Sequence, residues 1–109
     1  MSKRITLPQL KKYDITQKVM EALADSESRA ILFTIVKKGR TAAELSDKLK
    51  IPLSSVYKKL SDLEELTLIK VEQWMISDKG RKYKIYRSRI KQAEILIKKP
   101  EPVLILVSN

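Results

Sequence analysis

Apolar residues in the first third of the chain recur at helical spacing and predict two amphipathic helices. Asp14 or Thr16 is available as N-cap of the first helix, whose apolar stripe comprises Ile15, Val19, Met20 and Leu23. The second helix is expected to begin after Asp25, because that carboxylate can accept hydrogen bonds from the free N–H groups of a first turn. It is expected to end at Lys37-Lys38-Gly39, after a stripe comprising Ile31, Leu32, Ile35 and Val36.

A third and a fourth helix follow, separated by a short turn. Thr41-Ala42-Ala43-Glu44 has the spacing of a capping box and predicts a helix to about Lys50 that buries Leu45 and Leu49. Pro52 disfavours helical geometry at Ile51 but suits the first turn of a new helix. The predicted buried stripe of that fourth helix is Leu53, Val56, Leu60 and Leu63. Its opposite side carries Ser54, Tyr57, Lys58 and Ser61, with Ser55 and Lys59 on the flanks.

Beyond Leu66 the pattern changes to that of strands. Residues 68–76 are rich in β-branched and aromatic residues, and Ser77-Asp78-Lys79-Gly80 is a turn before a second extended run at 83–86, so a β-hairpin is predicted. Trp74 is expected to pack at the base of this hairpin. Tyr83 and Tyr86 fall on opposite faces of one strand, so one should be buried. Residues 93–99 and 103–107 predict two further strands around Pro100-Glu101-Pro102, although the first could be helical.

Positive charge is concentrated at the two ends of the chain. The net charge of the 109 residues is +10, yet residues 13–66 hold nine basic and nine acidic groups and sum to zero. Residues 1–12 hold four basic groups and no acid, and residues 67–109 hold ten basic and four acidic groups. Seven of these cations lie within residues 79–91. Such clustering is typical of a surface that binds phosphates, because counterion release drives that binding.

The absence of cysteine and histidine excludes disulfides, thiolate or imidazole metal sites, and catalysis by either residue. No glycine-rich phosphate loop, nucleophile motif or paired-acid spacing stands out, so we expect no enzyme activity and no cofactor. Asp14, Asp25 and Glu27 are explained as helix caps and not as a cation site. The longest apolar run, 103–107, is far shorter than the roughly 20 residues of a membrane span, so we expect a soluble, cytoplasmic protein.

Together these elements predict an α+β chain with a winged helix-turn-helix architecture of three to four helices, a β-hairpin wing and an extended C-terminal tail. Residues 1–12 are interpreted as a basic N-terminal arm, 13–91 as the winged domain, and 92–109 as a C-terminal extension of possible strands or a dimerisation element. In such a domain the fourth helix, about 53–66, offers its N-terminal face to bases, and the wing, 77–84, lies along a neighbouring groove or strand.

The chain also resembles ArsR-type winged-helix transcription regulators over residues 20–90. The resemblance rests on three segments, namely Leu23 to Leu32, Thr41 to Leu45 with Leu49, and Ser54 to Tyr57 followed by Leu60, Leu63-Glu64 and Leu68-Ile69. Two features depart from the family pattern. Thr67 stands where glycine is usual, so this helix is expected to end without left-handed geometry. The absence of cysteine and histidine argues against metal sensing.

The resemblance implies a role for each residue that matches the family's DNA-contacting positions. Ser54, Ser55, Tyr57 and Lys58 match the groove-facing positions, and Lys59 would flank them. Lys79, Arg81, Lys82 and Lys84 in the wing would contact phosphates or the minor groove. The alternative interpretation of both sets is a solvated surface.

The expected function is therefore sequence-specific binding of double-stranded DNA by a homodimeric transcription regulator. The helix from Ile15 to Ala24 and the apolar tail strands are the candidate dimer surfaces. Two alternatives stay open at this point: a protein-interaction module of the transcription machinery, and an RNA-binding protein. The sequence does not indicate the operator, the direction of regulation or an effector.

Overall fold

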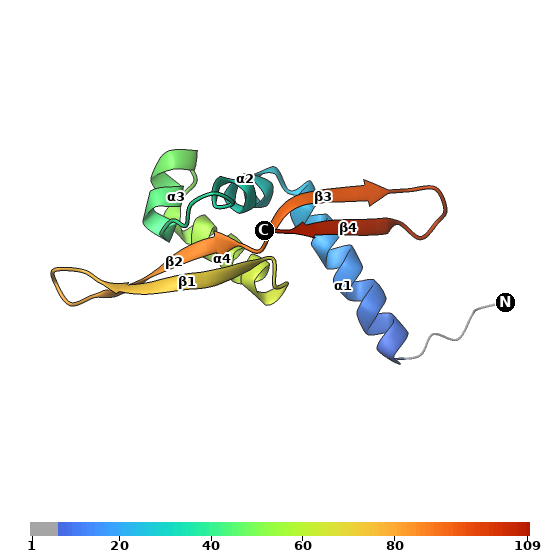
Figure 1. Ribbon diagram of the computed structural model, residues 1–109, viewed down its shortest axis with the longest axis horizontal. Helices are drawn as coiled ribbons and strands as arrows, with labels where there is room; N and C mark the ends of the chain where they lie inside the picture. Colours follow the sequence, from blue (N-terminus) through green and yellow to red (C-terminus); the bar gives the residue numbers. More distant parts are fainter. Residues whose placement is uncertain (1–6) are drawn as a thin grey trace.

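The computed structural model describes residues 7–109, with side chains from residue 15 onward, as an elongated molecule of 62 × 25 × 24 Å (Figure 1). Four helices are followed by two β-hairpins. The helices are α1 (Leu7–Ala24), α2 (Ser26–Thr34), α3 (Ala42–Leu49) and α4 (Leu53–Glu65), and the strands are β1 (Ile69–Ile76), β2 (Lys82–Ser88), β3 (Ile90–Leu96) and β4 (Val103–Ser108). The predicted α+β fold with a hairpin wing is confirmed.

The first two helices differ from the prediction at their ends. Helix α1 begins at Leu7, so neither Asp14 nor Thr16 is its N-cap, and the second half of the predicted N-terminal arm is helical. The rest of that arm lies outside the described residues. Helix α2 is capped by Asp25 as expected but ends at Thr34. Gly39 therefore does not end the helix. Its lack of a side chain allows close packing, because a Cβ there would lie 2.7 Å from Ile85 Cγ2.

Helices α3 and α4 form as predicted, with one exception in the buried stripe. Thr41 and Glu44 make the complete capping box of α3, and Pro52 is the N-cap of α4. Val56, Leu60 and Leu63 are buried, whereas Leu53 is 43% exposed. Leu53 lies in the first turn of α4, beyond the part of the helix that packs on the core, so the predicted burial of this residue is wrong.

Helix α4 ends in left-handed geometry, contrary to the expectation for Thr67. Thr67 has φ 61°, its N–H donates to the Glu64 carbonyl, and the Leu68 N–H donates to the Leu63 carbonyl. This pair of bonds is the Schellman motif, which normally places glycine in the left-handed position. The chain therefore keeps the geometry of a glycine cap while carrying a β-branched residue, which makes the position strained.

The β1–β2 hairpin is the wing of the fold. The two strands pair antiparallel from Ile69 opposite Ser88 to Ile76 opposite Lys82, with an irregularity between Val71 and Gln73. Gly80 takes the positive φ of 78° that the turn requires. Tyr86 is buried and Tyr83 exposed, as strand alternation predicted.

The C-terminal segment forms a second antiparallel hairpin, β3–β4, which confirms the predicted strands and excludes the helical alternative for the first of them. It projects from the body at the opposite end from the wing tip (Figure 1). The base of this hairpin is attached to the body, because the Asn109 side chain donates to the carbonyls of Val36 and Ser88.

The core is formed where α2, α3 and α4 meet the base of the wing. Its fully buried side chains are Ile31, Leu32, Ile35, Leu45, Val56, Leu60, Leu63, Leu68 and Ile69. Val19 and Leu23 join α1 to this cluster, and Ile90 joins the base of β3. Because the buried stripe of α4 is held by this core, the opposite side of α4 stays on the surface.

Candidate nucleic-acid interface

The exposed ridge of α4 is the first part of the candidate site. Ser54, Lys58 and Ser61 lie at intervals of four and three residues opposite the buried stripe, and all three are exposed. Tyr57, which is 53% exposed, stands beside this ridge on the side of the wing. The N-terminal half of α4 thus exposes a hydroxyl group, a phenol and an ammonium group, which are groups that contact base edges and phosphates.

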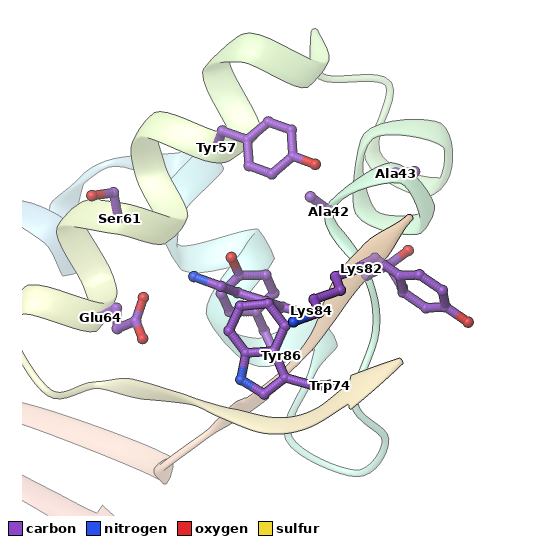
Figure 2. Close-up of a pocket in the computed structure, with 11 residues that line it drawn as sticks. Ala42, Ala43, Tyr57, Ser61, Glu64, Trp74, Lys82, Lys84 and Tyr86 are labelled. Atoms are coloured by element: carbon purple, nitrogen blue, oxygen red, sulfur yellow. The ribbon is translucent and has the colours of Figure 1, made fainter. Parts of the chain in front are cut away.

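A groove of about 520 Å³ separates α4 from the wing (Figure 2), and we call it the wing groove. Tyr57, Ser61 and Glu64 line it from α4, and Trp74, Lys82, Tyr83, Lys84 and Tyr86 line it from the wing. Thr41, Ala42 and Ala43 contribute the N-terminal end of α3. Burial raises the pKa of the Tyr86 phenol, and the nearby Glu64 carboxylate adds to that effect. Tyr86 therefore stays neutral in the groove.

Trp74 lies in this groove, so the predicted packing of its ring at the wing base is wrong. The indole is 59% exposed, and Lys84, its cross-strand partner, places Nζ 5.0 Å from the ring centroid. Figure 2 shows the two side chains together on the face of the wing that is directed toward α4. Strand alternation explains the error, because it turns Trp74 onto that open face and away from the core. The result is an aromatic and cationic surface next to the exposed side of α4.

Comparison with known proteins identifies the helices on which this surface is built. Residues 23–72 match the family model of a helix-turn-helix domain. The fold is a winged helix-turn-helix. In this architecture α3 and α4 are the paired helices, and β1–β2 is the wing.

Solved structures that share this fold include the following two. NolR from Sinorhizobium fredii matches with a TM-score of 0.61 and 18% identity, covering 80% of this chain and 81% of the other. Reduced HlyU from Vibrio cholerae N16961 matches with a TM-score of 0.57 and 17% identity, covering 76% of this chain and 81% of the other. No curated protein sequence matches the chain.

The other side of the second helix of the helix-turn-helix borders a different groove, between α4 and α1. Lys18, Ser55, Lys58 and Lys59 line this α1 groove together with five acids, namely Glu21, Asp25, Glu27, Asp62 and Glu65. Lys59 is held there, because its Nζ lies 2.7 Å from Asp25 Oδ2 and 3.7 Å from Glu27 Oε1. The mixed charge of the α1 groove makes it a poor surface for a polyanion.

The sequence-predicted site residues are thus divided among three places. Tyr57, Lys82 and Lys84 meet at the wing groove, and Ser55, Lys58 and Lys59 line the α1 groove, with Lys58 also on the exposed ridge that begins at Ser54. Lys79 and Arg81 are exposed at the wing tip. Lys59 differs from the rest because its ammonium group is engaged by Asp25, and the contact joins α4 to the N-terminus of α2.

Trp74, Ser61 and Glu64 are among the groove residues that the sequence did not single out as contacts. For Trp74 the sequence did contain a signal. Residues two apart in a strand share a face, so Trp74 lies on the same face as Ile76 and as their cross-strand partners Lys84 and Lys82. Arg87 follows the same basic run but is not free, since it donates to Glu72 and to the Val36 carbonyl. Within residues 7–109 no cluster of three acidic, cysteine or histidine side chains could hold a metal ion, and no helix is long and apolar enough to cross a bilayer.

Proposed function

We propose that this protein is a sequence-specific regulator of transcription that binds double-stranded DNA. The N-terminal half of α4 enters the major groove, where Ser54, Tyr57 and Lys58 contact base edges and the adjoining backbone. The wing, residues 77–84, follows the neighbouring phosphates or minor groove through Lys79, Arg81, Lys82 and Lys84. In this proposal the protein acts in the cytoplasm, catalyses no reaction and uses no cofactor.

One observation carries this proposal: the side of α4 that carries Tyr57 and Ser61 and the cationic face of the wing border the same groove. Tyr57 and Ser61 on α4 and Lys82 and Lys84 on the wing line the wing groove together. A duplex backbone seated between these elements would meet ammonium groups on one side and hydroxyl groups on the other. Phosphate contacts of this kind fix the register of the helix, which then allows base edges to be read.

The distribution of acids supports this orientation. Five carboxylates lie along the α1 groove, on the far side of α4 from the wing, while Glu64 is the acid that lines the wing groove. A polyanion is therefore attracted to the wing side. Lys59 is left out of the proposed contacts, because its ammonium group is already paired with Asp25.

The proposal includes a homodimer. A single helix in the major groove reads only a few base pairs, and two-fold pairing doubles the contacts on a palindromic site. The candidate surfaces are the helix from Ile15 to Ala24 and the tail strands, where Ile15, Val103 and Ile105 are exposed.

Selection of bound duplexes from a random pool tests specificity and half-site symmetry in one experiment. A palindromic motif is the expected result, and recovery of unrelated sequences would contradict it. Tyr57→Ala and Lys58→Ala should change the selected motif, whereas Arg81→Ala with Lys82→Ala should weaken all duplexes alike. Lys98→Ala with Lys99→Ala is the matched control, because it also removes two exposed cations but from the turn of the other hairpin.

A retardation assay with competing nucleic acids separates the two alternative functions. Stronger competition by duplex RNA than by duplex DNA would replace the proposal with RNA binding. No retardation of either nucleic acid at low salt, with binding to an acidic protein of the transcription machinery retained, would indicate a protein-interaction module.

A further inference from the structure

The C-terminal hairpin carries apolar side chains on both faces. In an antiparallel pair, partners directly opposite each other point to the same face. The register therefore puts Ala93, Ile95, Leu104 and Leu106 on one face and Gln92, Glu94, Leu96, Val103, Ile105 and Val107 on the other. Only Ala93 and Leu104 of these residues are among the side chains packed against the core. Val103 is 55% exposed and Ile105 40% exposed.

A hairpin of this composition is not stable by itself. Two isolated strands are marginal in water, and a sheet of three or more strands with an apolar face is normally required. A strand that is apolar on both faces, as in Val103-Leu104-Ile105-Leu106-Val107, is typical of a sheet interior. Among the described strands, β3 and β4 pair only with each other. A further strand or layer is thus expected to cover them.

The free edge of β4 differs from the other strand edges. Strand edges are usually protected by charged residues or proline, which prevent pairing with another chain. Strands β1, β2 and β3 each carry charged residues, such as Lys70, Lys84 and Lys91. Strand β4 carries neither a charge nor a proline. Its free edge is available for pairing and has no feature that opposes it.

We propose that β4 pairs antiparallel with β4 of a second copy, so that two hairpins form one continuous four-stranded sheet. The occupant is a second copy for two reasons. An isologous contact needs a self-complementary edge, and an uncharged antiparallel strand satisfies this condition. Each chain also carries a net charge of +10, so a surface without lysine or arginine, such as β4, favours contact between two copies.

Symmetry fixes the register of this pairing. A two-fold axis normal to the sheet keeps each face continuous, so residues of one face must lie opposite residues of the same face. Full overlap of residues 103–107 then places Ile105 opposite Ile105 of the partner subunit. Val103 lies opposite Val107 of the partner subunit, and by symmetry Val107 lies opposite Val103 of the partner subunit.

This arrangement leaves the proposed DNA surface open. The hairpin extends from the body on the side away from α3, α4 and the wing (Figure 1). The inference rests on the proposed function only in taking the regulator to be a homodimer. It is tested without nucleic acid, so its failure would not affect DNA binding by a single copy, and loss of DNA binding would not affect the dimer.

The test is a charge exchange between Val103 and Val107 in the full chain, with the dimer dissociation constant measured by sedimentation. Val103→Glu and Val107→Lys each place a charge against an apolar residue and should weaken the dimer at least about tenfold. The double variant puts Glu opposite Lys at two symmetric positions and should bind at least about threefold tighter than either single variant. Within one hairpin positions 103 and 107 face Leu96 and Gln92, so no such pair forms inside the monomer.

Val103→Glu with Ile105→Lys is the matched control. It carries the same two charges on the same face, but the register places lysine opposite lysine, so no recovery is expected. Recovery in this control, failure to recover in the exchange variant, or a wild-type monomer at about 100 μM would each overturn the proposal. Circular dichroism of every variant verifies that the helical domain is folded.

Hydrogen exchange separates edge pairing from face-to-face packing. Alternate N–H groups of an antiparallel strand point to opposite edges. In the wild-type dimer consecutive amides of residues 104–107 should all be protected, and in Val103→Glu only every second one. Protection of alternate amides in the dimer as well would contradict edge pairing.

Discussion

Lys59 Nζ, on the second helix of the helix-turn-helix, lies 2.7 Å from the Asp25 carboxylate that caps α2. The same Asp25 oxygen accepts the Ser28 backbone N–H and the Ser28 hydroxyl. One carboxylate therefore satisfies the first turn of α2 and holds α4 against it. The contact fixes the orientation of α4, whose other side borders the wing groove.

Removal of the Asp25 charge should destabilise the protein at neutral pH and progressively less in acid. The hydrogen bond from Lys59, followed by those from Ser28, holds the pKa of Asp25 well below its ordinary value of 3.8. A carboxyl whose pKa is lowered by folding stabilises the native state above its ordinary pKa, and this contribution is lost as pH falls further. Asp25→Asn keeps a side chain that can cap the helix and removes only the charge. In urea unfolding, the free energy of unfolding of this variant should be lower than that of the wild type at pH 7, and the difference should narrow below about pH 4.

Asp47→Asn is the control for this experiment, because it removes a carboxylate whose ion pair with Lys50 is 3.9 Å long and fully on the surface. It should change the free energy of unfolding by no more than about 0.5 kcal/mol at either pH. An Asp25→Asn deficit of equal size at pH 7 and pH 3 would show that the charge on Asp25 does not contribute.

Thr67→Gly should stabilise the protein. Left-handed geometry costs a residue with a Cβ about 1–2 kcal/mol, and this cost is partly offset by the greater backbone freedom of glycine in the unfolded chain. The expected net gain is roughly 0.5–1 kcal/mol, which raises the melting temperature by a few degrees. A lower melting temperature would contradict the strain at this helix end.

Gly80→Ala is the opposite substitution, because Gly80 already has a positive φ and a Cβ there would meet no atom within 4 Å. The loss of stability should therefore reflect backbone conformation alone, at about 1 kcal/mol. Thermal unfolding should therefore give a higher melting temperature for Thr67→Gly and a lower one for Gly80→Ala.

Trp74 should report directly on DNA binding. It is the only tryptophan in the chain and it is exposed in the wing groove, so its fluorescence is expected to be quenched when a duplex covers that groove. Trp74→Phe should remove the signal with little loss of affinity, and Trp74→Ala should weaken binding. Unchanged emission at saturating duplex would place the DNA elsewhere on the protein.

Binding should weaken steeply with salt. If the complex neutralises roughly six phosphates, the logarithm of the binding constant should fall with the logarithm of salt concentration with a slope near −5. Arg81→Ala with Lys82→Ala should reduce the magnitude of this slope by about two. A slope near zero would remove the electrostatic basis of the proposed interface.

Local signals in the sequence were sufficient to predict most of the helices and strands. The Thr41 and Glu44 capping box, the Asp25 cap, the Pro52 boundary and the glycine turn at Gly80 each act within a few residues. Their geometry depends on the side chain itself, so it could be predicted without knowledge of the fold. The role of Gly39 could not be predicted in this way, because it depends on close packing against Ile85, which is distant in sequence.

The residues of the wing groove were only partly predictable. Lys82 and Lys84 were identified from charge, and Tyr57 from its position on a helix face. The exposure of Trp74 and the ion pair of Lys59 were not predicted, because both are set by contacts between elements. Trp74 faces an open groove and not the core, and Lys59 meets a carboxylate 34 residues earlier in the chain.

The sequence by itself determined the helices, the wing, the C-terminal strands and the concentration of positive charge, because periodicity, capping and composition act over short distances. The tertiary structure decided which of those charges remain available, since ion pairing of Lys59 and Arg87 depends on partners from other elements. It also decided that α4 and the wing share one groove and that β4 keeps a free edge. Both are consequences of how helices and hairpins pack, and packing is not encoded within any single segment.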